Sequence, residues 1–227
     1  GDLMKLEATT TDYLQQSVPG FDMEAPHYWA NKVLTDGVTA ADLTVNEPAL
    51  IGWLHTLEAI SQLCMASARY RAAANYARRV LKAEGYPTRA AGTVLLALAR
   101  LEDQDGFFAL AHQLEEEIGA DALENSPWYL LARTILLFKT NKMRPAVRAL
   151  REFANRCEGG AFFLLNPMYQ TPYLPCRPEP RDPWDLSHQA VWEADGIISD
   201  TPDFAPWANA CEDVSQLAQE FARRYGF

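Results

Sequence analysis

The segment that most constrains the fold is Leu57–Pro87, LEAISQLCMASARYRAAANYARRVLKAEGYP, which has the pattern of two amphipathic helices joined by a tight turn. Apolar residues recur at helical spacing in both halves. Ala73 and Ala77 allow two helix backbones to approach each other closely. Gly85 fits the position after a helix end, and Pro87 prevents the helix from continuing. The sequence therefore predicts an antiparallel helical hairpin.

Similar hairpin patterns recur twice downstream. The predicted helices cover residues 49–66, 70–84, 88–102, 106–118, 126–140 and 143–156. When the second helices are aligned by Tyr70, Phe107 and Met143, the copies are offset by 37 and 36 residues. A period of this length is typical of stacked helical hairpins. We therefore expect an all-α fold, a right-handed stack of antiparallel helical hairpins that forms an α-solenoid.

A mixed N-terminal segment precedes the predicted repeats. Leu3–Gln16 predicts a short helix, and a second helix is expected to begin at Pro26. Asn46 is a suitable N-cap for the first repeat helix, with Pro48 in its first turn. The expected division is an N-terminal helical segment at 1–48, helical repeats at 49–157 and a third segment at 158–227.

The composition changes in the third segment. Prolines become frequent, and Pro172–Pro183 can be neither helix nor central strand. The many aromatic residues make residues 158–207 too apolar for a disordered linker. We expect a short helix at about Leu186–Asp195 and a final helix at Trp207–Arg224. This proline- and aromatic-rich segment is expected to fold back onto the repeats, as a cap or across their groove, so that the chain forms one compact unit.

The hairpin pattern resembles a tetratricopeptide repeat (TPR). Several positions match its signature on the first and second helix: Leu57, Ile60, Ser61 and Cys64, then Tyr70 and Ala73. In the later copies, Phe107 and Leu110, and then Met143 and Ala146, stand where the signature has Tyr and Ala. The resemblance implies a TPR-like stack of hairpins.

A wider resemblance covers residues 80–210. The runs VLKAEGYPTRAAGTVLLALARLEDQDGFFALAHQL and SPWYLLARTILLFKTNKMRPAVRALREFANRCEGGAFFLLN look like helical hairpins of bacterial tetratricopeptide proteins related to the suppressor-of-tumorigenicity (seven) family. The Asn-Pro-x-Val-Pro core of that family is absent, because Cys157-Glu158-Gly159-Gly160 stands there. The resemblance implies a bacterial helical-repeat protein and supplies no catalytic residues.

In such a stack the first helices line a concave face. The candidate partner-binding residues on or beside this face are His55, Glu58, Gln62, Arg100 and Arg133. Most other positions on the face are apolar: Gly92, Leu95, Ala99, Leu131 and Ile135. A clamp for a peptide carboxylate needs Lys, Arg and Asn, so capture of a C-terminus is not expected. An exposed apolar groove is unfavourable, and the 160–207 segment is the expected cover.

Residues with catalytic or metal-binding potential are scattered. The four histidines, at 27, 55, 112 and 188, have no zinc-type spacing, and phosphate-loop and nucleophile-elbow motifs are absent. The best acidic cluster is Glu193, Asp195, Asp200 and Asp203. Two carboxylates in an aromatic pocket can act as acid and base, whereas aspartates beside Pro202 favour capping of backbone N–H groups. We predict no catalytic residue, no metal and no cofactor.

Charge and cysteine content limit the partners and the compartment. A net charge of -10 disfavours nucleic acid and anionic membranes, and no apolar run is long enough to span a bilayer. The four cysteines form no CxxC motif, which favours reduced thiols and a cytoplasmic location. In an exported protein, Cys157 and Cys176 could instead form a disulfide. The chain begins with Gly1, which is compatible with a removed leader.

These features favour a non-enzymatic scaffold that binds a protein or peptide, whose identity the sequence does not give. The alternative is a small helical enzyme or ligand-binding domain, with a pocket where the 160–207 segment meets the repeats. A structural or self-associating module is a third interpretation, and the oligomeric state stays open. An enzyme pocket gathers convergent polar groups, whereas a scaffold exposes a broad surface.

Overall fold

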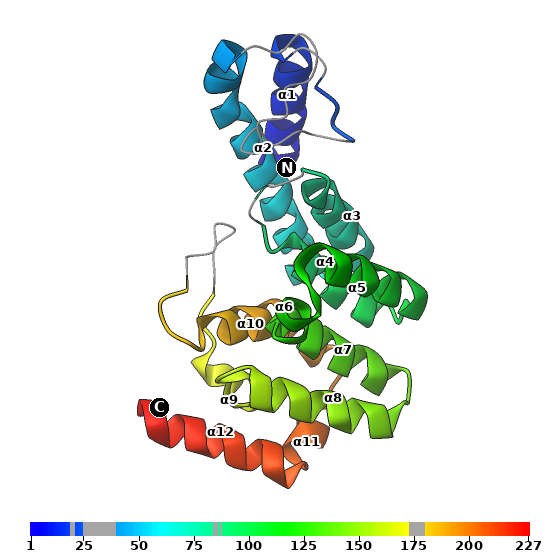
Figure 1. The fold of residues 1–227 in the computed structure, drawn as a ribbon, viewed down its shortest axis with the longest axis vertical. Helices are drawn as coiled ribbons and strands as arrows, with labels where there is room; N and C mark the ends of the chain where they lie inside the picture. Colours follow the sequence, from blue (N-terminus) through cyan, green and yellow to red (C-terminus); the bar gives the residue numbers. More distant parts are fainter. Residues whose placement is uncertain (19–20, 25–39, 84–85, 87, 173–179) are drawn as a thin grey trace. The chain divides into compact units, whose positions relative to one another are not determined.

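The computed structural model describes residues 1–18, 21–24, 40–83, 86, 88–172 and 180–227, with the backbone alone at 40–47 (Figure 1). Every regular element in these residues is helical, which confirms the predicted all-α class. Contacts divide the chain into two compact units, Gly1–Val94 and Leu95–Phe227, with the boundary inside α4 (Ala90–Arg100). The solenoid stacking and the division at 48/49 and 157/158 stay predictions.

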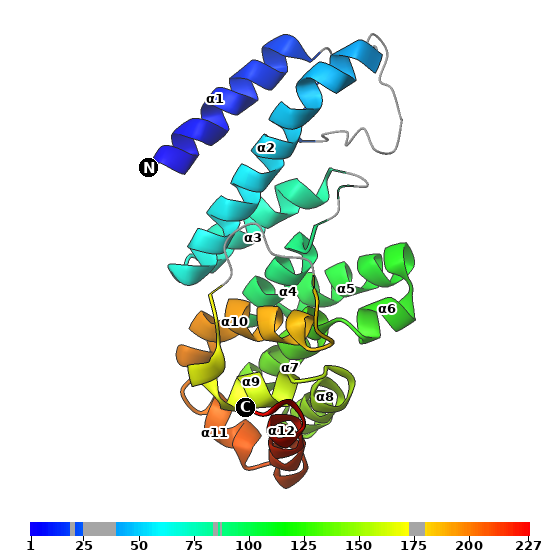
Figure 2. The ribbon, with the colours of Figure 1, turned by 90° about the vertical axis from the view of Figure 1, so that its left-hand side faces the viewer.

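Unit 1 is built around the long helix α2 (Ala40–Ala66). It packs against α1 (Asp2–Ser17) and against α3 (Tyr70–Leu81), as Figure 2 shows. Four large side chains at helical spacing on α2 are fully buried: Leu50, Trp53, Leu54 and Leu57. The Trp53 Nε1–H donates to Thr11 Oγ1 of α1 at 2.9 Å, which satisfies the buried indole polar group.

The seam between α2 and α3 is made of small residues, as the alanine pattern predicts. Ala73, Ala74 and Ala77 are buried. The Ser61 hydroxyl on α2 donates to the Ala73 carbonyl at 2.8 Å, so the two backbones lie close together. The helical hairpin expected at Leu57–Pro87 is therefore confirmed as far as Leu81, whereas Gly85 and Pro87 lie outside the described residues.

Unit 2 continues the helical pattern after α4. Its last hairpin is α7 (Pro127–Lys139) and α8 (Met143–Arg156), and the bounds of α8 confirm the predicted ones. The Ser126 hydroxyl caps α7 by accepting from the Tyr129 backbone N–H at 3.4 Å. The remaining helices of the unit are α5 (Gln104–Ile118), α6 (Ala120–Glu124), α9 (Gly160–Leu165), α10 (Asp185–Ser199), α11 (Phe204–Asn209) and α12 (Glu212–Tyr225).

The described helices of the proline- and aromatic-rich segment pack on the last hairpin. Helix α10 lies against α7, and α9 contacts α8, α10 and α12 (Figure 1). The Trp128 Nε1–H of α7 donates to Glu193 Oε2 of α10 at 2.8 Å, and both side chains are buried. The segment therefore folds back onto the α7–α8 hairpin through α9 and α10.

Two predicted boundaries are wrong. Helix α2 already begins at Ala40, ahead of Asn46, and runs through Pro48. The predicted final helix 207–224 is two helices, since Cys211 has an extended backbone that separates α11 from α12. Helix α9 was not expected from the sequence. The second helix predicted from Pro26 lies outside the described residues.

The small-residue seam gives a stability test. Replacing buried Ala77 by leucine should force α2 and α3 apart and lower the free energy of unfolding by about 1–3 kcal/mol. Asn75→Leu is the control, since it introduces the same side chain at an exposed position of α3 and should change the free energy by no more than about 0.5 kcal/mol. Thermal and urea denaturation followed by circular dichroism measure both. An equal loss of unfolding free energy in the two variants would contradict close packing of α2 against α3 at Ala77.

Candidate functional site

The apolar positions expected to line a groove belong to the core. Leu95, Ala99, Leu131 and Ile135 are all buried, and Gly92 is buried as well. Their burial agrees with the expectation that an apolar groove would not stay exposed to water. On α7 the reason is visible, because α10 packs against this helix.

Three of the predicted binding residues share one face of α2. His55 is exposed, and Glu58 and Gln62 are half-buried. The His55 ring lies 6.2 Å from the Tyr86 ring, measured between centroids. Glu58 accepts hydrogen bonds from the Tyr86 hydroxyl at 3.5 Å and from the Thr88 hydroxyl. Glu58 therefore holds the segment before α4 against α2, and His55 and Gln62 lie beside this anchor.

The other two predicted residues lie in unit 2 and form ion pairs. Arg100 Nη2 lies 3.6 Å from Asp200 Oδ2, and Arg133 Nη1 lies 3.0 Å from Glu152 Oε2. Each of these guanidinium groups is matched by a carboxylate of its own unit. The structure thus groups the predicted residues into the α2 set in unit 1 and two separate ion pairs in unit 2.

The acidic cluster considered for catalysis has structural roles. Glu193 accepts the hydrogen bond of the buried Trp128 indole. Asp200 pairs with Arg100 and sits at the C-terminal end of α10. Asp203 precedes α11, but its side chain makes no capping hydrogen bond there, so the predicted cap at this residue is wrong. The structure therefore engages two of these carboxylates in contacts that hold helices together.

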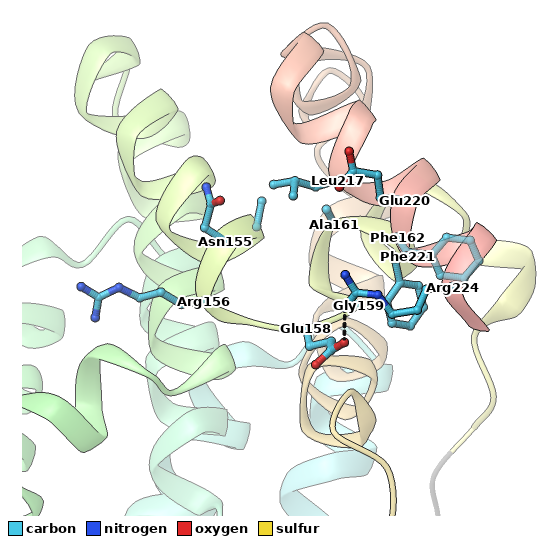
Figure 3. A pocket seen from close by; sticks show the side chains of 11 residues that line it. Asn155, Arg156, Glu158, Gly159, Ala161, Phe162, Leu217, Glu220, Phe221 and Arg224 are labelled. Atoms are coloured by element: carbon cyan, nitrogen blue, oxygen red, sulfur yellow. Dashed lines mark hydrogen bonds and ion pairs between the residues drawn. The ribbon is translucent and has the colours of Figure 1, made fainter.

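A cavity of about 280 Å³ lies where α8, α9 and α12 meet (Figure 3). Asn155 and Glu158 border it from the end of α8, and Leu217, Glu220 and Arg224 border it from α12. Phe162 and Phe221 provide aromatic walls. Arg224 Nη1 pairs with Glu158 Oε1 at 3.0 Å, shown by the dashed line in Figure 3, and Tyr225 donates its hydroxyl to the same oxygen at 2.8 Å.

Two glycines allow α9 to approach α8 and α12 closely enough to shape this cavity. Gly159 has φ +75, and a Cβ there would meet the Phe163 and Phe221 rings at 3.0 Å. A Cβ on Gly160 would lie 2.7 Å from the Phe153 ring. In the sequence, this pair stands out only as part of the Cys157–Gly160 stretch, where the Asn-Pro-x-Val-Pro core is absent. Two adjacent glycines shortly after a predicted helix are nevertheless the sequence feature that could have indicated close helix packing.

Beside the cavity, an aromatic cluster encloses His188 of α10. The His188 ring lies 4.4 Å from the Phe163 ring, and its Nε2 accepts the Thr171 backbone N–H at 3.0 Å. Burial lowers the pKa of His188 below its usual value of 6.5, against a smaller opposing effect of Asp185. The imidazole is therefore held neutral, with Nε2 as the acceptor.

Cys157, next to the glycines, is a buried free thiol. Burial raises its pKa to about 12, since a thiolate would lose its hydration there. The alternative disulfide of Cys157 is not formed in this structure, and Cys176 lies outside the described residues. Cys157 acts here as a small core residue.

No family model, no curated protein and no solved structure matches the chain. Within the described part of the chain, no group of three or more His, Cys, Asp and Glu side chains is arranged to hold a metal ion. Among the same residues, no helix combines the length and apolar character needed to cross a bilayer. Two features of the described residues present polar groups at the surface: the α2 face in unit 1 and the cavity in unit 2.

The close packing around Gly159 can be tested by mutation. Gly159→Ala should lower the free energy of unfolding by roughly 2 kcal/mol, because it combines a left-handed backbone with crowding against two phenylalanine rings. Gly226→Ala is the control, since Gly226 has nearly the same φ, +76, but open space around a Cβ. A smaller loss is expected there in chemical denaturation. Losses of equal size would show that ring packing does not constrain Gly159.

His188 predicts a pH dependence of stability. Because the pKa of His188 is lower in the folded protein than 6.5, the unfolded chain takes up a proton first as pH falls. The contribution of the buried neutral imidazole to the free energy of unfolding is therefore present above pH 6.5 and is lost as pH falls below that value. His188→Gln keeps an acceptor for Thr171 and should reduce the loss of stability between about pH 7.5 and 5.5. His112→Gln, at an exposed histidine, should not. Unchanged pH dependence in His188→Gln would contradict the buried neutral state.

Proposed function

We propose that this chain is a TPR-like helical-repeat scaffold that binds a protein or peptide through the exposed face of α2. The main observation in its support is that the turns between the paired helices have the same backbone conformation in three hairpins. After α2, α4 and α7, a non-glycine residue has a positive φ, namely 57° at Ala68, 60° at Glu102 and 56° at Asn141.

The hydrogen bonds of these turns are also the same. The residue after each left-handed residue donates to the carbonyl five positions back: Arg69 to Cys64, Asp103 to Leu98 and Lys142 to Leu137. The left-handed residue itself donates three positions back, to Met65, Ala99 and Phe138. This is the Schellman ending of a helix. Each second helix then begins two residues after the left-handed residue, at Tyr70, Gln104 and Met143.

This repetition supports repeated hairpins as the building unit. It also revises the sequence alignment, since Gln104 and not Phe107 occupies the place of Tyr70 and Met143. The left-handed residues are spaced by 34 and 39 residues, close to the predicted period. Repeated hairpins bind partners through extended surfaces more often than they perform chemistry.

The α2 face is the preferred surface because its counterpart on α7 is covered. Helix α10 packs on α7, whereas His55 on α2 is exposed beside Tyr86. The face offers an imidazole, an amide and an aromatic ring, with Glu58 already used to hold Thr88. Such groups suit the backbone and polar side chains of an extended peptide better than a terminal carboxylate. A cytoplasmic bacterial setting is part of the same proposal, from the family resemblance and the thiols.

A second candidate is a ligand-binding domain, and the cavity in Figure 3 favours it. Its walls come from the end of α8, from α9 and from α12, where the repeats meet the segment that follows them. Its polar groups are mainly an ion pair and a single further carboxylate, Glu220, an arrangement that supports recognition more than acid–base chemistry.

The scaffold proposal is tested with a double substitution, His55→Ala with Gln62→Ala, against the control His112→Ala at another exposed helical histidine. The native host's proteins retained by each form are identified, and the affinity of any selective binder is then measured with purified components by calorimetry. We expect the double substitution to weaken binding about tenfold or more, from two lost contacts of about 1 kcal/mol each, and the control to bind normally. Identical affinity of all three forms would overturn the assignment to α2.

A further inference from the structure

We propose that the cavity between α8, α9 and α12 binds the guanidinium group of an arginine side chain presented by a partner protein. The site is distinct from the α2 face and lies wholly in unit 2. The proposal rests on three features of the cavity: one unmatched negative charge, acceptors on opposite walls, and a half-apolar lining of suitable size.

The charge of the cavity follows from its ion pairs. Arg156 points away from it in Figure 3 and pairs with Glu124 at 2.9 Å. Arg224 is matched by Glu158 at 3.0 Å. Glu220, at the rim on α12, makes neither an ion pair nor a hydrogen bond with any residue that the structure describes. One negative charge therefore stays unbalanced, which favours a cation and repels phosphate or carboxylate.

The acceptors are placed to bind a planar, multiply donating group. Asn155 donates its amide N–H to the Arg151 carbonyl at 2.7 Å, which orients the side-chain oxygen as a free acceptor among the described residues. Asn155 and Glu220 stand on opposite sides of the cavity, on α8 and α12 (Figure 3). A guanidinium group has five N–H donors in a rigid plane and can reach acceptors on two walls, whereas an ammonium is a compact, strongly hydrated charge.

The lining fits the rest of an arginine side chain. Ala161 and Leu217 offer apolar contact for the methylene stem, and Phe162 and Phe221 offer aromatic edges and faces near the charge. The volume, about 280 Å³, holds a single side chain and not a large ligand. The chain's net charge of -10 attracts a basic partner at longer range. These features together select an arginine from a protein over a bulky cofactor.

The test compares binding of three small probes to the full chain by NMR: acetyl-arginine amide, acetyl-lysine amide and acetyl-citrulline amide. Citrulline has nearly the same shape as arginine and no charge. We expect the arginine probe to shift the amide signals of Gly159 and Leu217 with millimolar affinity, the lysine probe to bind more weakly and the citrulline probe to leave the signals unchanged. Binding should weaken as salt is added.

Variants make the assignment specific. Glu220→Gln should weaken binding of the arginine probe about tenfold, because it removes a charge-assisted contact. Glu212→Gln is the control, as Glu212 is exposed on the same helix and does not border the cavity. Thermal unfolding of both variants should match that of the parent chain. Equal binding of arginine and citrulline, or full affinity in Glu220→Gln, would overturn the proposal.

A last comparison distinguishes a partner's side chain from a free small cation. A Gly-Gly-Arg-Gly-Gly peptide should bind at least as tightly as the acetyl-arginine probe, whereas methylguanidinium, which lacks the stem, should bind more weakly. Tighter binding of methylguanidinium than of the peptide would show that flanking backbone is excluded, and it would overturn the partner assignment.

Discussion

The close packing at Gly159 and Gly160 is the constraint on which the C-terminal part of unit 2 depends. A Cβ at these two positions would meet the rings of Phe163 and Phe221, and of Phe153. Without side chains there, α9 comes close to α8 and α12 and carries Phe162 and Phe163 into the aromatic cluster. The cavity is the space left between these helices, so its shape depends on the same turn.

The burial pattern explains why the apolar face of α7 is not a candidate for binding. An exposed apolar groove costs free energy in water, and the chain avoids this cost on α7 by packing α10 against it. The buried Trp128 and Glu193 satisfy each other's polar groups within this contact. Polar side chains stay accessible on the His55 side of α2 and at the rim of the cavity, at Glu220.

Much of the helical framework could be predicted from the sequence, because periodicity reports which residues face the core. Helix α8 and the Ala73–Ala77 seam follow from this pattern directly. The start of α2 and the break at Cys211 could not be predicted, since tertiary packing decides whether a helix runs through a proline or ends. The α2 face was predictable as three residues of one helix face. The cavity was not, because it joins residues about sixty positions apart.

The three hairpin turns share a backbone conformation but not a residue type. A left-handed backbone costs a non-glycine residue roughly 1 kcal/mol, yet it occurs at Ala68, at Glu102 and at Asn141. Three unlike side chains adopting one strained conformation indicate that helix packing on both sides of the turn imposes it. The likeness of the three turns thus lies in the backbone, and the exposed residues are free to differ between hairpins. In a chain built this way, substitutions at exposed positions can change the surface chemistry without changing the fold, and the α2 face and the cavity do differ in chemistry.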